Sequence, residues 1–208
     1  VVLIDCDFGL NNLDVVTGVE NKIIFDLIDV LNGRCRPKQA LIQSEYSSNL
    51  FVMPCAHTLS KTDISGQNLK VVLENIENLF DFMIFDCPAG IDLGFHRAVS
   101  CADEAIVVVT PNLTSIRDAD KVVSILQSYR LEKVSLVVNR VRGDLIINQK
   151  MISPTDVEQI LKTISSDSLR LLSANDRVKI IKDKLNITDL IPIQIAEYAQ
   201  SDMFWSIC

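Results

Sequence analysis

The chain has 208 residues, of which 48% are apolar and 23% are charged, so it can bury a substantial core and we expect one folded domain rather than disorder. The net charge of -7 leaves too little positive charge to displace counterions from a phosphate backbone, so we expect no nucleic acid partner. Six cysteines without a CxxC pair favour reduced thiols in a cytosolic protein. A metal site at Cys55 and His57 is disfavoured because no second pair of ligands follows.

Strands and helices are predicted to alternate along the first 160 residues. The apolar runs at 1–4, 50–53, 82–85, 105–110 and 134–138 are typical of buried strands. Helical patterns lie at 23–32, 68–80, 95–101, 115–129 and 154–162, and the fourth is predicted to start at a Ser115 cap. This alternation predicts an α/β fold, with a mostly parallel sheet flanked by helices on both faces.

The last third of the sequence has a weaker pattern. No glycine follows Gly143, a helical stretch is predicted at 176–184, and no strand is predicted after 138. We therefore divide the chain into residues 1–160 and a divergent C-terminal part, 161–208, of the same domain.

Acidic side chains follow two of the predicted strands. Asp5 and Asp7 share one face if the first strand continues, and Asp86 ends the run at 82–85 in the manner of a Walker B aspartate. Ligands in parallel α/β sheets bind beyond the carboxyl ends of strands. Clustered carboxylates need a cation or hydrogen-bond donors to stay ionised, and Mg²⁺ prefers such oxygen ligands, while Asp7 is placed to orient a water molecule. The alternative is that these aspartates cap the turns or helices that follow.

A phosphate-binding loop would complete a nucleotide site, but the motif GxxxxGK[ST] does not occur in the chain. The first strand also begins without an initiating methionine or a preceding turn. We therefore expect a further strand and the phosphate-binding loop to lie upstream of Val1.

Three stretches resemble the deviant Walker (ParA/MinD) family of P-loop ATPases, and its MinD branch more than its ParA branch. They are "VVLIDCDFGLNNLDVVTGVENKIIFDLIDVLNGRCRPKQALI", "FDFMIFDCPAGIDLGFHRAVSCADEAIVVVTPNLTSIRDADKV" and "VVNRVRGDLI". Together they cover residues 1 to 160 in order, which makes this part a nucleotide-binding domain without its first strand and P-loop.

The resemblance implies roles for five positions. Asp5 and Asp7 match the aspartates of the first switch, near magnesium and the attacking water respectively, and Asp86 matches the aspartate that holds magnesium through water. Gly90 belongs to the second switch, next to the nucleotide. Asn139 matches the asparagine that recognises adenine, although a strand-end turn residue is the alternative.

The resemblance also implies a function. Members of this family bind ATP and Mg²⁺, form an ATP-dependent homodimer, and attach reversibly to the inner face of the cell membrane. With MinC-like and MinE-like regulators, the MinD branch selects the division site from the cytoplasm and inhibits septum formation away from mid-cell. The alternatives are a nonenzymatic module that binds the same partners, and a ParA-like partition or cargo-positioning ATPase.

Two departures from the family qualify these expectations. Without the P-loop, the chain as written is expected to hydrolyse ATP poorly, and the family's strand order leaves an unfilled position between the strands that end at Asp86 and begin near Ala105. No basic amphipathic helix is recognised near residue 208, which argues against membrane binding by this chain.

Overall fold

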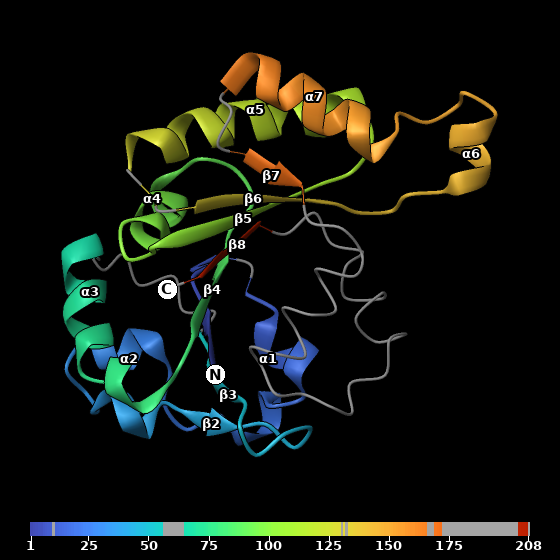
Figure 1. Ribbon diagram of the computed structural model, residues 1–208. Helices are drawn as coiled ribbons and strands as arrows, with labels where there is room; N and C mark the ends of the chain where they lie inside the picture. Colours follow the sequence, from blue (N-terminus) through green and yellow to red (C-terminus); the bar gives the residue numbers. More distant parts are fainter. Residues whose placement is uncertain are drawn as a thin grey trace.

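A mixed sheet of eight strands forms the centre of the molecule, in the order β2-β3-β1-β4-β8-β5-β6-β7 (Figure 1). The computed structural model describes residues 1–9, 11–55, 65–129, 131, 133–165, 169–171 and 204–207. The strands are β1 Val2–Asp5, β2 Ile42–Gln43, β3 Phe51–Met53, β4 Met83–Cys87, β5 Glu104–Val109, β6 Lys133–Val138, β7 Leu169–Leu171 and β8 Phe204–Ile207. Among these described strands, only β2 and β8 run antiparallel to their neighbours. The predicted mostly parallel α/β fold is therefore confirmed.

Helices connect most of these strands. The α-helices are α1 Leu13–Thr17, α2 Leu27–Leu31, α3 Gly66–Glu74, α4 Leu93–Val99, α5 Leu113–Ser128, α6 Gly143–Ile147 and α7 Pro154–Ser165. Short 3-10 helices lie at Glu20–Lys22, Pro37–Gln39 and Glu77–Leu79. None of the helices within the described ranges is long and apolar enough to cross a membrane.

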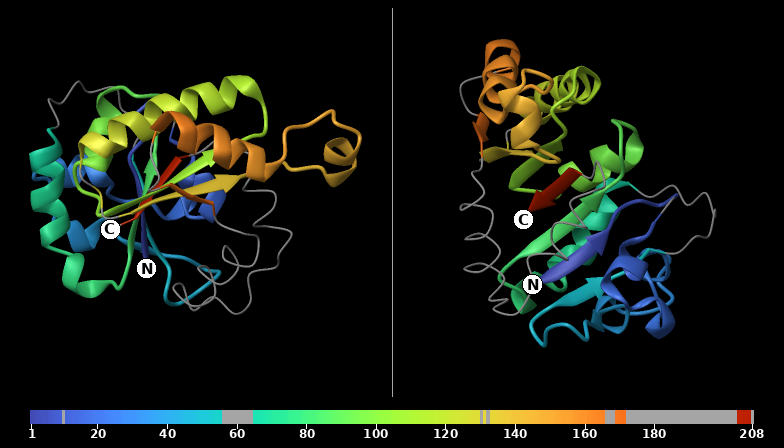
Figure 2. Two further views of the ribbon diagram at one scale, coloured as in Figure 1. Left: turned by 45° about the horizontal axis from the view of Figure 1, so that its top comes forward. Right: turned by 90° about the vertical axis from the view of Figure 1, so that its right-hand side faces the viewer.

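Both faces of the sheet carry helices, as the alternating side chains of β1 require. Val2 and Ile4 point into the main core, which α2, α3, α4, α5 and α7 complete. Leu3 points the other way, into a smaller cluster built around Leu13 of α1 and Val52 of β3. Helices α5 and α7 pack side by side over the β5–β7 end of the sheet (Figure 2).

Two predicted helix starts are wrong, and hydrogen bonds explain both. Helix α2 begins after Asp26, not at residue 23, because Asp26 and Asp29 form a reciprocal capping box. Helix α5 is capped by Asn112, whose side chain accepts a hydrogen bond of 2.9 Å from the backbone N–H of Ser115. Ser115 is not the cap, since its hydroxyl accepts from the backbone N–H of Thr110. Helix α3 also ends at Glu74, earlier than predicted, and gives way to a 3-10 turn.

The C-terminal part contains strands that the sequence did not predict. Strand β7 extends the sheet beyond β6 in parallel, and β8 lies between β4 and β5. Trp205 is the register partner of Asp86 on one side and of Ile106 on the other. The position expected to lack a strand therefore holds an antiparallel one. The helix predicted at 176–184 lies outside the described residues.

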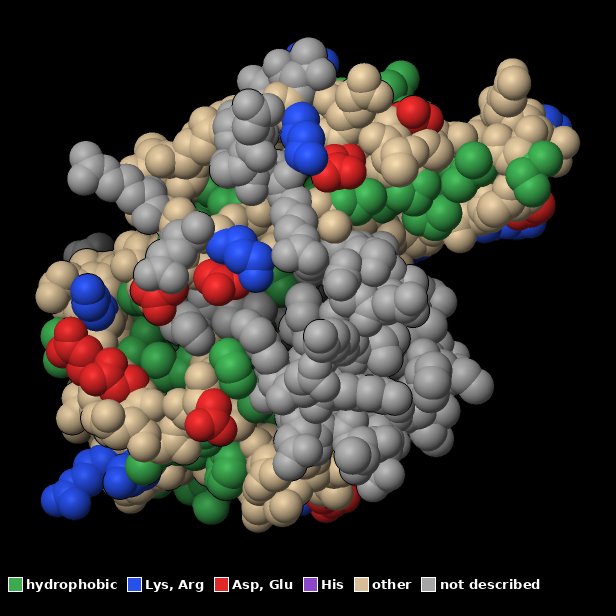
Figure 3. Space-filling view, in the orientation of Figure 1, with side chains coloured by type: hydrophobic (Ala, Val, Ile, Leu, Met, Phe, Trp, Pro, Cys, Tyr) green, Lys and Arg blue, Asp and Glu red, His purple; other side chains and the backbone are tan. Residues whose placement is uncertain are grey.

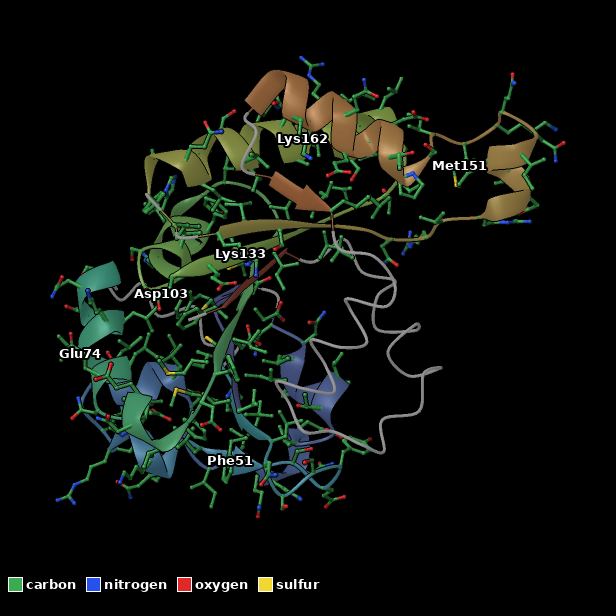
Figure 4. The ribbon with its side chains drawn as sticks, in the orientation of Figure 1. Phe51, Glu74, Asp103, Lys133, Met151 and Lys162 are labelled. Carbon is green, nitrogen blue, oxygen red and sulfur yellow. The ribbon has the colours of Figure 1, made fainter. Side chains whose placement is uncertain are left out.

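An arm that carries α6 leaves the sheet after β6 and returns at α7, and it projects away from the remaining elements (Figures 1 and 2). Its apolar residues include Val141, with 39% of its surface exposed, and Ile147, with 83%. Hydrophobic side chains run along the arm in Figure 3. The backbone N–H of Arg142 lies 3.3 Å from the sulfur of Met151, which ties the two ends of the arm together (Figure 4).

Candidate functional site

Asp5 and Asp86 stand side by side at the carboxyl ends of neighbouring parallel strands. Asp5 is the last residue of β1, and its register partner in β4 is Asp86. Both side chains are almost fully buried, with 1% and 5% of their surfaces exposed. The apolar residues that precede each aspartate fix this placement, because they commit the two strands to the middle of the sheet.

Burial and the charges of neighbouring carboxylates perturb both carboxyl groups. Burial raises the pKa of Asp5 to about 7, against the lowering effect of the backbone N–H of Asp7 and Leu13. Burial also raises the pKa of Asp86 to about 8, and the charges of Asp5 and Asp7 add to this shift. Two neighbouring carboxyl groups with raised pKa values form a site that a positive charge would stabilise.

The hydrogen bonds of this pair are incomplete. Oδ1 of Asp5 accepts a bond of 2.9 Å from the backbone N–H of Asp7, but Oδ2 of Asp5 and Oδ1 of Asp86 are buried without a partner among the described residues. A divalent cation would satisfy both oxygens and lower both pKa values. Magnesium fits this donor set, since it takes one or two carboxylates and keeps water or phosphate for its other positions. Within the described ranges no group of three or more metal-binding side chains is assembled. The two carboxylates therefore suit a magnesium ion that takes most of its ligands from water or phosphate.

Asp7 lies in the loop that follows β1, at the rim of this site. It is half-buried, its Oδ1 accepts a hydrogen bond of 3.0 Å from the backbone N–H of Gly9, and its charge acts on both Asp5 and Asp86. Asp7 thus lies near the buried pair rather than within it, and it is the most accessible to solvent of the three predicted aspartates. That position suits a side chain that orients water.

Two buried polar residues that follow β1, one of which acts on Asp5, were missed by the sequence analysis. Asn11 and Asp14 are buried, each has a side-chain oxygen without a partner in the described part of the chain, and the charge of Asp14 raises the pKa of Asp5. The Asn11 amide donates to the backbone carbonyl of Cys55, which anchors the loop. The acid and amide groups in "NNLD" were the available signal, but a loop sequence does not reveal burial.

Gly90 lies in the loop after β4, at the same end of the sheet as the aspartates. Its φ of 99° falls in the region that favours glycine, and a Cβ there would meet no described atom within 4 Å. Gly94, in α4, approaches this loop closely, because a Cβ on it would lie 2.8 Å from Cγ of Pro88. The loop after β4 therefore packs closely against α4 at Pro88, whereas the space around Gly90 is free of described atoms.

Asn139 follows β6, at the same edge of the sheet but farther along it. Strands β8 and β5 separate β6 from β4, and Asn139 is half-buried. Its backbone N–H donates to the carbonyl of Val109 at 2.7 Å. Its side-chain amide makes no hydrogen bond within the described part of the chain, so the amide is available to a ligand. The structure does not bring Asn139 into contact with the aspartates, and its role in base recognition stays a prediction.

Known proteins share this architecture and sequence. A family model described as an AAA domain matches residues 1–138. A putative septum site-determining protein MinD from Emiliania huxleyi is 41% identical over 202 residues, covering 94% of this chain and 74% of the relative. The septum site-determining protein MinD of Bacillus subtilis is 43% identical over 180 residues, covering 86% of this chain and 66% of the relative. The structure of the MinC:MinD cell division protein complex of Aquifex aeolicus matches with a TM-score of 0.72 and 33% identity, covering 95% of this chain and 76% of that one.

The mostly parallel sheet, its helices on both faces and the buried aspartate pair define a protein with the P-loop NTPase fold. Within that class, the extent and identity of the matches are decisive. The chain belongs to the ParA/MinD family of ATPases, in its branch of septum site-determining MinD proteins.

Proposed function

We propose that the protein is an ATP-dependent switch in division-site selection that inhibits septum formation away from mid-cell. The observation that carries this proposal is the buried pair Asp5 and Asp86, whose unpartnered oxygens, within the described residues, call for a cation, in a chain 41% to 43% identical to MinD proteins. Since the chain spans 66% of the length of the Bacillus relative, the activity of the whole protein is part of the proposal.

Each site residue has a chemical role in this proposal. Asp5 and Asp86 would hold Mg²⁺, which supplies positive charge to the phosphates of ATP. Asp7, at the solvent-accessible rim, orients the water that attacks the terminal phosphate. Gly90 lets the loop after β4 change its backbone conformation between states, and the Asn139 amide reads the adenine edge.

We also propose that the protein acts in the cytoplasm and reversibly at the inner face of the membrane, as an ATP-dependent homodimer. The Aquifex relative is described in a complex with MinC, which supports a MinC-like partner here. A MinE-like regulator that stimulates hydrolysis completes the proposed cycle.

Magnesium-dependent ATP binding tests this function. We expect a fluorescent ATP analogue to bind the full-length protein, including the upstream segment expected from the sequence, with Mg²⁺ and to bind much less well when the metal is chelated. Asp86→Asn should remove the magnesium dependence, because one of the two buried ligands is lost. The matched control is Asp103→Asn, which alters an exposed carboxylate just before the amino end of β5, whereas Asp5 and Asp86 lie at the carboxyl ends of their strands (Figure 4). Binding of equal strength with and without Mg²⁺, or in Asp86→Asn, would count against the proposed site.

A further inference from the structure

A cavity of about 600 Å³ lies between α3 and α4, outside the aspartate site. Figure 1 shows the first turn of α3 beside α4. The described residues that line the cavity are Ser65, Gly66, Gln67, Lys70, Leu93, His96, Arg97 and Ser100. No acidic side chain is among these lining residues, although the whole chain carries a net charge of -7. The cavity therefore concentrates positive charge and hydrogen-bond donors in an acidic protein.

The two permanent cations of the cavity are not neutralised by described neighbours. Within the described ranges, none of the six ion pairs includes Lys70 or Arg97. Arg97 is held in place by stacking, since its guanidinium lies 5.6 Å from the centre of the Phe8 ring. The guanidinium of Arg97 is therefore ordered but unpaired within the described residues, and it is available to an anion together with the exposed Lys70.

The remaining donors are also held in position. Nδ1 of His96 lies 2.6 Å from the hydroxyl of Tyr129, which orients the imidazole ring. At the opposite wall, Ser65 caps the start of α3, and its hydroxyl accepts from the backbone N–H of Asn68. The first turn of a helix has further N–H groups without intrahelical acceptors, and together with the helix dipole they favour a negative charge.

The floor of the cavity is closely packed. A Cβ on Gly66 would lie 2.4 Å from the Ser100 hydroxyl oxygen, and the Cys101 thiol donates to the Gly66 carbonyl at 3.7 Å. The Ser100 hydroxyl donates to the Arg97 carbonyl at 2.7 Å. These contacts join the start of α3 to the end of α4, so the cationic walls form one preorganised surface.

We propose that this cavity binds a phosphate group, as a second anion site separate from the aspartate pair. Lys70 and Arg97 supply the charge, and the Ser65 hydroxyl and first-turn N–H groups of α3 supply directional hydrogen bonds. The phosphate is either inorganic phosphate or a phosphate ester of a small molecule. This site does not depend on the proposed switch function.

Titration of the ¹⁵N-labelled protein with inorganic phosphate at low ionic strength tests the proposal, because exposed charges are screened least there. We expect saturable shifts of the amide signals of Gly66, Gln67 and Ser100. A parallel titration with glycerol 3-phosphate separates the two sources. Tighter binding of the ester identifies an organic phosphate, and tighter binding of inorganic phosphate identifies the free ion.

Charge-removing variants identify the groups responsible. Lys70→Gln, at an exposed position that cannot affect the core, should weaken phosphate binding about threefold, and adding Arg97→Gln should bring the loss to about tenfold. The matched control removes two other exposed cations by Lys38→Gln and Lys150→Gln, and should leave the affinity unchanged.

Three results would overturn the proposal. Equal weakening in the control variant would mean a general charge effect. Shifts confined to Asp5, Asp7 and Asn139 would place the phosphate in the proposed nucleotide site and leave that function standing. Shifts at Gly66 caused by an acidic peptide, with none caused by either phosphate, would make the cavity a peptide-binding surface. Conversely, phosphate binding at Gly66 in a protein that fails to bind ATP would leave this inference intact.

Discussion

The raised pKa values of Asp5 and Asp86 predict that the metal-free protein loses stability as the pH rises. In the unfolded chain both groups have pKa values near the usual 3.8, whereas in the folded protein they are about 7 and about 8. Between these limits the folded state binds more protons than the unfolded state. The contribution of the pair is therefore complete below the unfolded pKa and is lost as the pH rises through the folded values.

The size of the effect follows from the shift. A shift of about three pKa units, at about 1.4 kcal/mol per unit, makes ionisation of one of these carboxyl groups cost on the order of 4 kcal/mol in the folded protein. From about pH 5 to about pH 8, where Asp5 contributes about two pH units of slope and Asp86 about three, we expect the free energy of unfolding to fall by roughly 6 kcal/mol. Asp86→Asn should reduce this fall to about 3 kcal/mol, because the amide cannot ionise and only Asp5, whose pKa is raised mainly by burial, still titrates.

Urea denaturation followed by circular dichroism measures the free energy of unfolding at each pH. Addition of Mg²⁺ at the higher pH should restore much of the lost stability to the unsubstituted protein and little to Asp86→Asn. The control Asp103→Asn should show the same pH dependence as the unsubstituted protein. If stability did not change with pH, or if Asp86→Asn kept the full slope, the reasoning from burial and repulsion would be refuted.

Three further substitutions test the packing and the caps by urea denaturation. Phe85→Ala, at a fully buried position of β4, should lower the free energy of unfolding by about 3–5 kcal/mol, and a loss below about 1 kcal/mol would contradict its place in the core. Asn112→Ala should cost about 1 kcal/mol through loss of the α5 cap, and no loss would argue against that cap. Gly66→Ala should cost about 1–3 kcal/mol because its Cβ would overlap the Ser100 hydroxyl. Adding Ser100→Ala should recover part of that loss, and a failure to do so would place the strain elsewhere.

The sequence predicted the central strands and the aspartate pair because both depend on local pattern. An uninterrupted apolar run identifies a strand buried on both faces, and parallel strands bring their carboxyl ends to one edge, so the pattern alone is enough to place Asp5 near Asp86. The same reasoning does not reach Asn11 and Asp14, since their burial depends on how α1 packs against the opposite face of β1. The α5 cap was misassigned because Ser115 has an alternative partner, the backbone N–H of Thr110, that only the fold supplies.

Strand β8 has a consequence for the order in which the molecule is assembled. Among the described strands, it alone joins the β2-β3-β1-β4 half of the sheet to the β5-β6-β7 half, and it pairs Ile207 with Glu104, about 100 residues earlier. During synthesis, the strands of both halves therefore leave the ribosome before β8, the strand that pairs with β4 and β5 and joins the halves. Pairing between residues so distant in sequence forms slowly, so we expect β8 to pair after the strands within each half have paired. Amide hydrogens along β8 should exchange with solvent sooner than those between β5 and β6, and the nascent chain should be most open to proteases before β8 pairs.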